Sequence, residues 1–302
     1  MFKQKQIPTI IAAVCFLAAI CIMLYPAVSS YVNEKYRSEI HTAYEEVIEQ
    51  ADNSDLLQAK ELATAYNQSI IPGTAADNAY SQEALLAAAE DYGNQLNIAG
   101  DGLMGYVEVP KINVNLPIYH GTDSDTLDRG VGHLLGSSLP VGGESTHAIL
   151  TGHSGMASQR LFTDLEQLEM GDVFYLYVLG ETLAYQVDSI NTVLPYDTSL
   201  LGISQGKDYC TLVTCTPVTV NTHRLLVRGT RIPYEEAQEV QAEIEITEEP
   251  QTSNWAEQYI LGICMGILAV LIAGLIIVSV ILYRRKHPRR KRYKGGRYAK
   301  KA

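Results

Sequence analysis

The chain has 302 residues, of which 47% are hydrophobic, and a formal net charge of −11. All 34 acidic residues lie between Glu34 and Glu257 with only 10 basic residues among them, so this central part carries a charge of −24. The hydrophobic content excludes wholesale disorder, and the acidic centre argues against a nucleic-acid partner. Five cysteines in a chain of this length are too few for a disulfide scaffold, and they show no CxxC or Cys/His ligand spacing that would suggest zinc. We also expect no cofactor.

The first apolar run, from Ile7 to Val28, carries no charged residue. It is long enough to cross a bilayer and longer than the apolar stretch of about 7–15 residues found in signal peptides. Small residues at Ala18-Ala19 and Ala27-Val28-Ser29 offer cleavage sites, so a cleaved signal peptide is the alternative. We expect residues 1–28 to form a short tail and an uncleaved signal-anchor.

Residues 29–99 are predicted to form a helical stalk. Apolar residues recur at a spacing of three to four over residues 34–66, which predicts a helix. A loop over residues 67–81, rich in Asn, Pro and Gly, follows. Ser81 then caps a second helix that runs to about Leu96.

From residue 100 to residue 233, short β-rich runs alternate with turn residues, which predicts a barrel or a sandwich. One short helix is expected within this domain, at Leu161–Leu168. Residues 234–258 are acidic and poor in apolar residues, so we expect a linker there. The predicted strands are Met104–Val109, Val114–Tyr119, Thr146–Thr151, Val173–Leu179, Leu183–Val193, Asp208–Thr214 and Arg224–Ile232.

The second apolar run, from Ile260 to Leu282, predicts a transmembrane helix over residues 259–283. Aromatic residues flank it, as at a membrane interface, and residues 284–302 hold 11 basic residues and no acid. Because basic flanks stay in the cytoplasm, we expect both termini inside the cell and residues 29–258 outside the plasma membrane. The basic tail is expected to contact anionic membrane lipid rather than nucleic acid.

Two cysteines, Cys210 and Cys215, lie outside the apolar runs. Five residues apart on one strand, they are roughly 16 Å from each other, whereas a disulfide needs Cα atoms within about 7 Å. A free thiol outside the cell is a candidate nucleophile. We favour Cys215, because it ends its strand, where reactive groups gather; Cys210 is expected to be a small buried residue.

Arg224 begins the strand that returns after Cys215, so the two residues are predicted to lie side by side. Arg228 faces the same way but sits about 13 Å further along the strand. A guanidinium beside the thiol can donate to a developing oxyanion.

A nucleophilic thiol also needs an acid or base, and histidine is the usual one. His153 follows an apolar strand and lies between Gly152 and Gly155, which allow a sharp turn that exposes the ring. From spacing alone, His120 and His223 remain alternatives.

Five motifs in chain order carry a resemblance to a known family. Thr211–Cys215 resembles the TLxTC signature of sortases, the membrane-anchored transpeptidases of Gram-positive bacteria. The continuation to Gly229 resembles the TCTPxxxNTHRLLVRG segment of class C, or pilus-assembling, sortases. The upstream runs that are similar to the same family are Met104–Ile112, Leu116–Thr122, Gly130–Leu134 and Thr151–Gly155.

The resemblance implies a mainly β fold, a closed barrel of the sortase type with N-terminal helices and two transmembrane helices. It implies that Cys215 is the nucleophile, His153 the acid and base, and Arg224 the oxyanion donor or substrate clamp. Class C sortases also carry a lid with a DP-aromatic motif over the cysteine; here Asp77 and Tyr80 are the candidate lid residues, without the proline. The same resemblance makes other histidines structural, namely His120, His133 and His223.

The implied reaction is cleavage of an LPxTG-like sorting motif between Thr and Gly through a thioester, and transfer of the acyl group to an amine. In class C sortases that amine is a pilin lysine, which gives pilus polymerisation. The alternatives are an amine of a cell-wall peptide, which gives surface-protein anchoring, and a catalytically inactive surface-binding protein.

Overall fold

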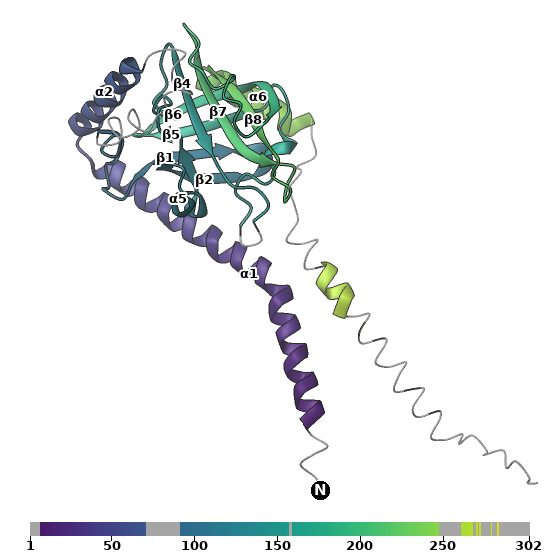
Figure 1. The fold of residues 1–302 in the computed structure, drawn as a ribbon. Coiled ribbons are helices and arrows are strands. Elements are labelled where there is room, and N and C mark those ends of the chain that lie inside the picture. The colour runs from purple at the N-terminus through teal and green to yellow at the C-terminus, as the bar shows by residue number, and fades with distance from the viewer. Residues whose placement is uncertain are drawn as a thin grey trace, which may run out of the picture. The chain divides into compact units, whose positions relative to one another are not determined.

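The computed structural model describes residues 7–70, 91–156, 159–247 and 261–267, with a few isolated positions beyond these. The chain divides into two units, Met1–Ser253 and Asn254–Ala302. The first unit holds two long helices and a β-barrel (Figure 1). The predicted lid loop with Asp77 and Tyr80, and most of the helix predicted from Ser81, lie outside the described residues.

Helix α1 (Ile7–Gln50) runs without interruption from the first apolar run into the stalk. The single helix predicted over residues 34–66 is therefore two helices: α1 ends at Gln50, and α2 (Asn53–Ser69) begins after Asp52. The Asp52 carboxylate accepts a hydrogen bond from the backbone N–H of Ser54 (3.0 Å). That contact satisfies a free donor at the start of the new helix, which fixes the break.

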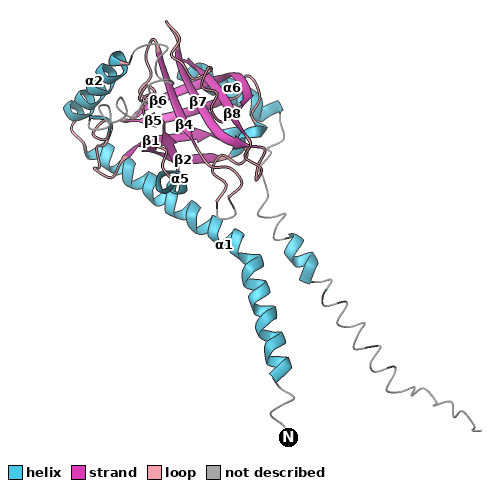
Figure 2. Cartoon of the chain, in the orientation of Figure 1, coloured by secondary structure: helices cyan, strands magenta, loops and turns pink. Residues whose placement is uncertain are grey.

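The barrel consists of eight strands, drawn as magenta arrows in Figure 2. Their order around the closed barrel is β1-β2-β3-β4-β7-β8-β6-β5. Two neighbouring pairs, β2 with β3 and β4 with β7, are parallel, and the others are antiparallel. The strands are β1 (Leu103–Val109), β2 (Val114–His120), β3 (Val131–His133), β4 (Thr146–Thr151), β5 (Val173–Val178), β6 (Glu181–Val193), β7 (Asp208–Thr216) and β8 (His223–Ile232).

Each of the seven predicted strands is present, with its ends within two residues of the prediction, and the closed barrel is confirmed. Strand β3 and the short helix α5 (Ser124–Arg129) were not predicted. The helix expected at Leu161–Leu168 is instead a series of turns with a single 3-10 turn, η3 (Leu165–Gln167). Another 3-10 turn, η2 (Pro110–Ile112), joins β1 to β2.

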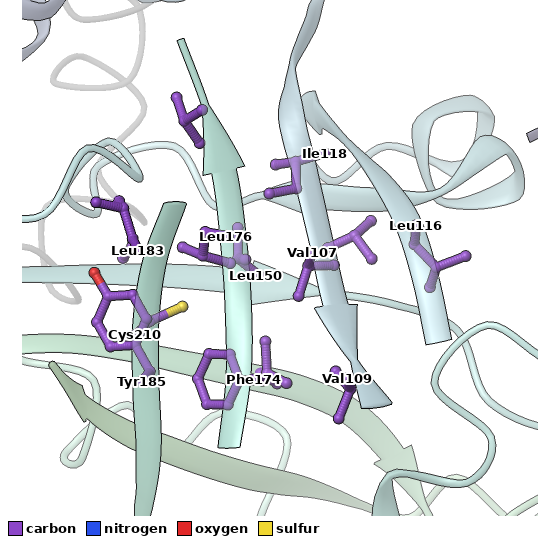
Figure 3. Close-up of a cluster of buried hydrophobic side chains, with 14 of the residues drawn as sticks. Val107, Val109, Leu116, Ile118, Leu150, Phe174, Leu176, Leu183, Tyr185 and Cys210 are labelled. Atoms are coloured by element: carbon purple, nitrogen blue, oxygen red, sulfur yellow. The ribbon is translucent and has the colours of Figure 1, made fainter. Parts of the chain in front are cut away.

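The barrel interior is filled by aliphatic and aromatic side chains from its strands (Figure 3). Phe174 and Tyr185 stack at its centre, with ring centroids 5.5 Å apart. Cys210 is wholly buried among them. Burial, reinforced by the negative charge of Asp208, raises the pKa of the Cys210 thiol well above its ordinary value, so this sulfur stays protonated and unreactive.

The segment predicted as an acidic linker begins with a helix, α6 (Tyr234–Thr247), which corrects that prediction. Glu235 and Glu236 lie in its first turn, where negative charge favours a helix start. Ala237 is fully buried against Tyr175 and other residues of β5 and β6. The few apolar residues of this segment are therefore enough to fix a helix on the barrel wall.

Within the described part of the chain, one helix is long and apolar enough to cross a membrane: residues Val14–Gln50 of α1 contain it. None of the residues in its apolar stretch is buried against the rest of the protein. Most of the second apolar run lies outside the described residues, although residues 261–267 are helical.

Two histidines are buried in the barrel wall as neutral rings. His133 Nε2 donates to the Ser138 carbonyl (2.8 Å), and His133 Nδ1 accepts from the Tyr92 hydroxyl (2.8 Å). His147 Nδ1 donates to a backbone carbonyl (3.0 Å), and its Nε2 accepts from the Thr211 hydroxyl (2.7 Å). Burial lowers the pKa of His133 to about 4 and that of His147 to about 4, because the charged ring loses its hydration there.

We expect the free energy of unfolding to fall as the pH falls from 6.5, the ordinary histidine pKa, towards 4. In that window the unfolded chain binds protons that the folded chain excludes, which costs about 1.4 kcal/mol per pH unit for each histidine. Asp208, whose pKa is raised by burial, acts in the opposite direction. Urea unfolding of the detergent-solubilised protein at about pH 7 and about pH 5 measures the slope of the free energy of unfolding against pH.

The variant His147→Gln keeps one donor and one acceptor but cannot titrate, so its slope should be shallower than that of the wild type. An equal slope in the variant would contradict the assignment of His147 as a buried neutral ring.

Candidate active site

Strand β7 brings the three candidate residues to one end of the barrel. Its antiparallel partner β8 places Arg224 directly opposite Cys215. Its parallel partner β4 ends with Thr151 level with Val213, so His153, two residues further on, comes level with Cys215. Neighbouring strands lie about 4.8 Å apart. The thiol of Cys215 is therefore flanked by His153 on one side and by Arg224 on the other, so the fold brings together the three residues singled out in the sequence.

Hydrogen bonds extend the β4–β7 pairing beyond the end of β4. Gly152 N–H donates to the Val213 carbonyl (2.9 Å), and the buried Thr214 hydroxyl donates to the Gly152 carbonyl (2.8 Å). The Ser154 hydroxyl then donates to the carbonyl of Cys215 (2.6 Å). These bonds flank His153 in the chain, so the histidine turn is fastened to the strand that carries the cysteine. Ser154 was not predicted to have a role, because the contact joins residues far apart in the sequence.

Two glycines allow this turn. A Cβ at Gly152 would lie 2.6 Å from the Phe162 ring, which closes over the turn and is fully buried. Gly155 has a φ of +71°, a left-handed backbone conformation that favours glycine, and a Cβ there would lie 2.9 Å from Val218. The Phe162 N–H donates to the His153 carbonyl (3.0 Å). The backbone of His153 is therefore held while its side chain stays about one-third exposed.

Arg224 contacts backbone carbonyls rather than acids among the described residues. Its Nη1 donates to the carbonyls of His223 (3.0 Å) and Asn221 (3.3 Å). A carbonyl orients a guanidinium without cancelling its charge. Arg228, four residues further along β8, instead forms an ion pair with Asp188 (2.8 Å). Arg224 thus brings a positive charge and spare N–H donors to the side of Cys215.

A carboxylate lies close to the other side of the site. Asp128 Oδ1 of α5 is 3.9 Å from Nε2 of His153. The Gln159 side chain, which is almost fully buried, donates to the backbone carbonyl of Asp128 (2.6 Å) and accepts from Arg37 of α1 (3.1 Å). The sequence gives no sign of these contacts, because they join residues that are 25 to 122 positions apart.

The other histidines of the barrel are placed differently. His133 and His147 are buried and occupied by hydrogen bonds. His120 has both ring nitrogens against backbone carbonyls, of Gly102 (2.9 Å) and Gln95 (2.7 Å). His223 begins β8 and pairs with Thr216 of β7, and its Nδ1 contacts the Thr222 hydroxyl (2.9 Å). His153 is the histidine that the β4–β7 register brings level with the thiol.

Nothing in the described ranges is arranged as a metal centre: no group of three or more His, Cys, Asp or Glu side chains is placed to hold an ion. Cys210 and Cys215 are both free thiols, and only Cys215 is partly exposed. The chemistry available at this end of the barrel is therefore that of a thiol, an imidazole and a guanidinium.

Comparison with known proteins identifies the family of the chain. A family model described as the sortase domain matches residues 107–232, which include the three candidate residues. Sortase C1 from Streptococcus agalactiae is 46% identical, with a TM-score of 0.59, and the match covers 65% of this chain and 98% of that one. Sortase C of Streptococcus pneumoniae is 44% identical, with a TM-score of 0.57 and coverages of 65% and 97%. The chain belongs to the sortase family.

This sortase also matches curated relatives over the barrel. Sortase D of Bacillus subtilis is 33% identical over 131 residues, and Sortase A of Streptococcus agalactiae is 29% identical over 130 residues. The matches span 63% and 52% of the length of those two relatives. The structural neighbours are class C sortases and share the closed barrel, so the predicted sortase-type fold is confirmed.

Proposed function

We propose that this sortase is a cysteine transpeptidase that cleaves an LPxTG-like sorting motif between Thr and Gly and joins the acyl group to an amine. The observation that carries the proposal is the meeting of His153, Cys215 and Arg224 at adjoining ends of β4, β7 and β8. A thiol between a proton carrier and a cation is the arrangement that acyl transfer through a thioester needs.

The acylation step uses all three residues. The Cys215 thiolate attacks the Thr carbonyl carbon, a C–S bond forms, and the carbonyl electron pair moves to the oxygen, where Arg224 donates hydrogen bonds. When the tetrahedral intermediate collapses, the C–N bond to Gly breaks and His153 gives its proton to the leaving amine. The acyl group is then held on Cys215 as a thioester.

The transfer step runs the same chemistry in reverse. The acceptor amine attacks the thioester carbon, His153 takes a proton from the attacking nitrogen, and the C–S bond breaks to return the thiolate. We propose a pilin lysine as this acceptor, which makes the reaction pilus polymerisation. Similarity to Sortase C of Streptococcus pneumoniae, whose structure was studied for pilin substrate specificity, and to sortase C1 of GBS Pilus Island 1 supports this choice.

The proposal includes a place at the plasma membrane. The apolar part of α1 and the second apolar run would both span the bilayer, with the basic tails in the cytoplasm and the barrel outside. Asp77 and Tyr80 are proposed as lid residues that cover the thiol until substrate arrives. The acidic exported part, with its charge of −24, suits a partner that presents a lysine.

A peptide assay of the full chain in detergent micelles tests the proposed reaction. We expect an LPxTG-type peptide to release its Gly-containing fragment, and mass spectrometry to find the remaining acyl group on Cys215. A lysine-containing pilin peptide should then collect the acyl group in preference to a cell-wall peptide amine. The double variant Asp77→Ala with Tyr80→Ala is assayed alongside, so that a closed lid is not taken for an inactive enzyme.

The outcomes separate the alternatives. Preference for the cell-wall amine would replace pilus polymerisation by surface-protein anchoring. Absence of both cleavage and an acyl adduct, in the wild type and in the lid variant, would contradict a transpeptidase and leave a surface-binding protein.

A further inference from the structure

Gln159 joins three separate parts of the chain through one buried amide. It lies on the loop that carries His153, its Nε2 donates to the backbone carbonyl of Asp128 on α5 (2.6 Å), and its Oε1 accepts from Arg37 Nη1 on α1 (3.1 Å). A buried amide with both its donor and its acceptor satisfied fixes the groups around it, because breaking either bond leaves a polar atom unpaired. The end of α5 and the His153 loop are therefore held to α1 at this point.

Asp128, which is fixed in this way, has its carboxylate close to His153. The Asp128 carboxylate lies 3.9 Å from Nε2 of the imidazole, and both side chains remain partly exposed. At this distance a carboxylate attracts an imidazolium but not a neutral ring. Arg160, the nearest cation on the same loop, is paired with Asp164. Within the described ranges, Asp128 is the carboxylate that forms a charge contact with His153.

We propose that Asp128 is a positioning residue for His153, and that Gln159 holds Asp128 in place by tying α5 to Arg37 of α1. The proposal rests on the proposed function, in which His153 gives a proton to the leaving amine. Asp128 acts through His153: its carboxylate attracts the imidazolium that forms during the reaction and fixes where that ring points. The helix that contains the apolar run thereby takes part in organising the acid of the reaction.

The first test compares two substrates that differ only in the leaving group. An LPxT-amide peptide releases an amine that needs a proton, whereas the matched thioester releases a thiolate that does not. In the full chain, Asp128→Asn should lower kcat/KM for the amide, which reports the acylation step, by about two- to fivefold, the range of an exposed ion pair. It should leave kcat/KM for the thioester unchanged. Asp128→Lys, which places a like charge beside the imidazolium, should lower the amide rate by about tenfold or more.

Two further variants serve as controls. Asp125 lies on the same helix and is exposed, so Asp125→Asn and Asp125→Lys make the same charge changes away from His153 and should leave the amide-to-thioester ratio unchanged. Asp128→Glu keeps the carboxylate and should restore most of the amide rate. If Asp128 had a merely structural role, its replacement would lower the rates for the amide and the thioester equally. Asp128→Asn and Asp128→Glu would then behave alike.

The second test addresses the connection to α1. Arg37→Ala should lower the amide rate in the same selective way and speed amide hydrogen exchange around His153. Lys35→Ala removes an exposed charge from the same helix and should change neither. If Arg37→Ala behaves as Lys35→Ala does in both measurements, the connection through Gln159 is wrong.

Failure of this proposal can be told from failure of the proposed function. If the wild type is active, Cys215→Ala is inactive, and Asp128→Asn and Asp128→Lys both keep the wild-type ratio of amide to thioester rates, Asp128 has no positioning role. If Cys215→Ala cleaves as the wild type does, the proposed function itself is wrong.

Discussion

Replacing Cys215 by Ala should lower kcat/KM for an LPxTG-type peptide by about four orders of magnitude or more, because no other group can form the thioester. The side chain is partly exposed at the end of β7, so its removal leaves the barrel core untouched. The folded fraction, followed by thermal unfolding, should stay as in the wild type.

Cys210→Ala is the matched control for that variant. Both cysteines lie on β7, but Cys210 is wholly buried and its raised pKa keeps the sulfur protonated. Its replacement should cost about 1 kcal/mol of stability through lost packing and leave the rate within about twofold of the wild type. Activity that survives in Cys215→Ala, or is lost in a folded Cys210→Ala, would overturn the choice of nucleophile.

Replacing Arg224 by Ala should lower kcat by about 10²–10³-fold, the usual cost of one oxyanion donor. Arg224 faces Cys215 across the β7–β8 ladder, and its guanidinium contacts carbonyls rather than acids among the described residues. Arg224→Lys should recover only part of the rate, because an ammonium lacks the planar fork of donors. Steady-state kinetics on the peptide substrate separate an effect on kcat from one on KM.

Arg228→Ala is the control on the same strand. Arg228 pairs with Asp188 and lies over the Tyr209 ring, so its loss should lower stability by about 1 kcal/mol without slowing the reaction. If Arg224→Ala instead raises KM and leaves kcat unchanged, the residue is a substrate clamp and the oxyanion role is wrong.

The strands were predictable because their signal is local. Apolar β-branched and aromatic runs bounded by turn residues mark each of the seven, and the structure shifts their ends by at most two residues. Strand β3 escaped prediction because three residues, Val131–His133, are too few to show an alternation. Helix α6 escaped because a single buried contact face, centred on Ala237, fixes a segment whose composition is mostly polar.

The candidate site, like the fold, has parts that could be predicted from the sequence and parts that could not. Arg224 could be placed beside Cys215 from the sequence, since a short loop joins their strands and fixes the antiparallel register. The place of His153 could not, because it depends on the parallel pairing of β4 with β7, whose partners are 62 residues apart. Asp128 and Gln159 were missed because only the folded chain brings α5, α1 and the His153 loop together.

The unbroken course of α1 has a geometric consequence. With residues Ile7–Val28 in the bilayer, as we propose, Arg37, which donates to Gln159 on the His153 loop, lies nine residues beyond Val28 on the same continuous helix. At 1.5 Å per residue this is an arm of about 14 Å. Each residue added to it would lift the barrel by about 1.5 Å and turn it by about 100°. The length of this arm therefore sets both the height of the thiol above the lipid and the direction in which it faces arriving proteins.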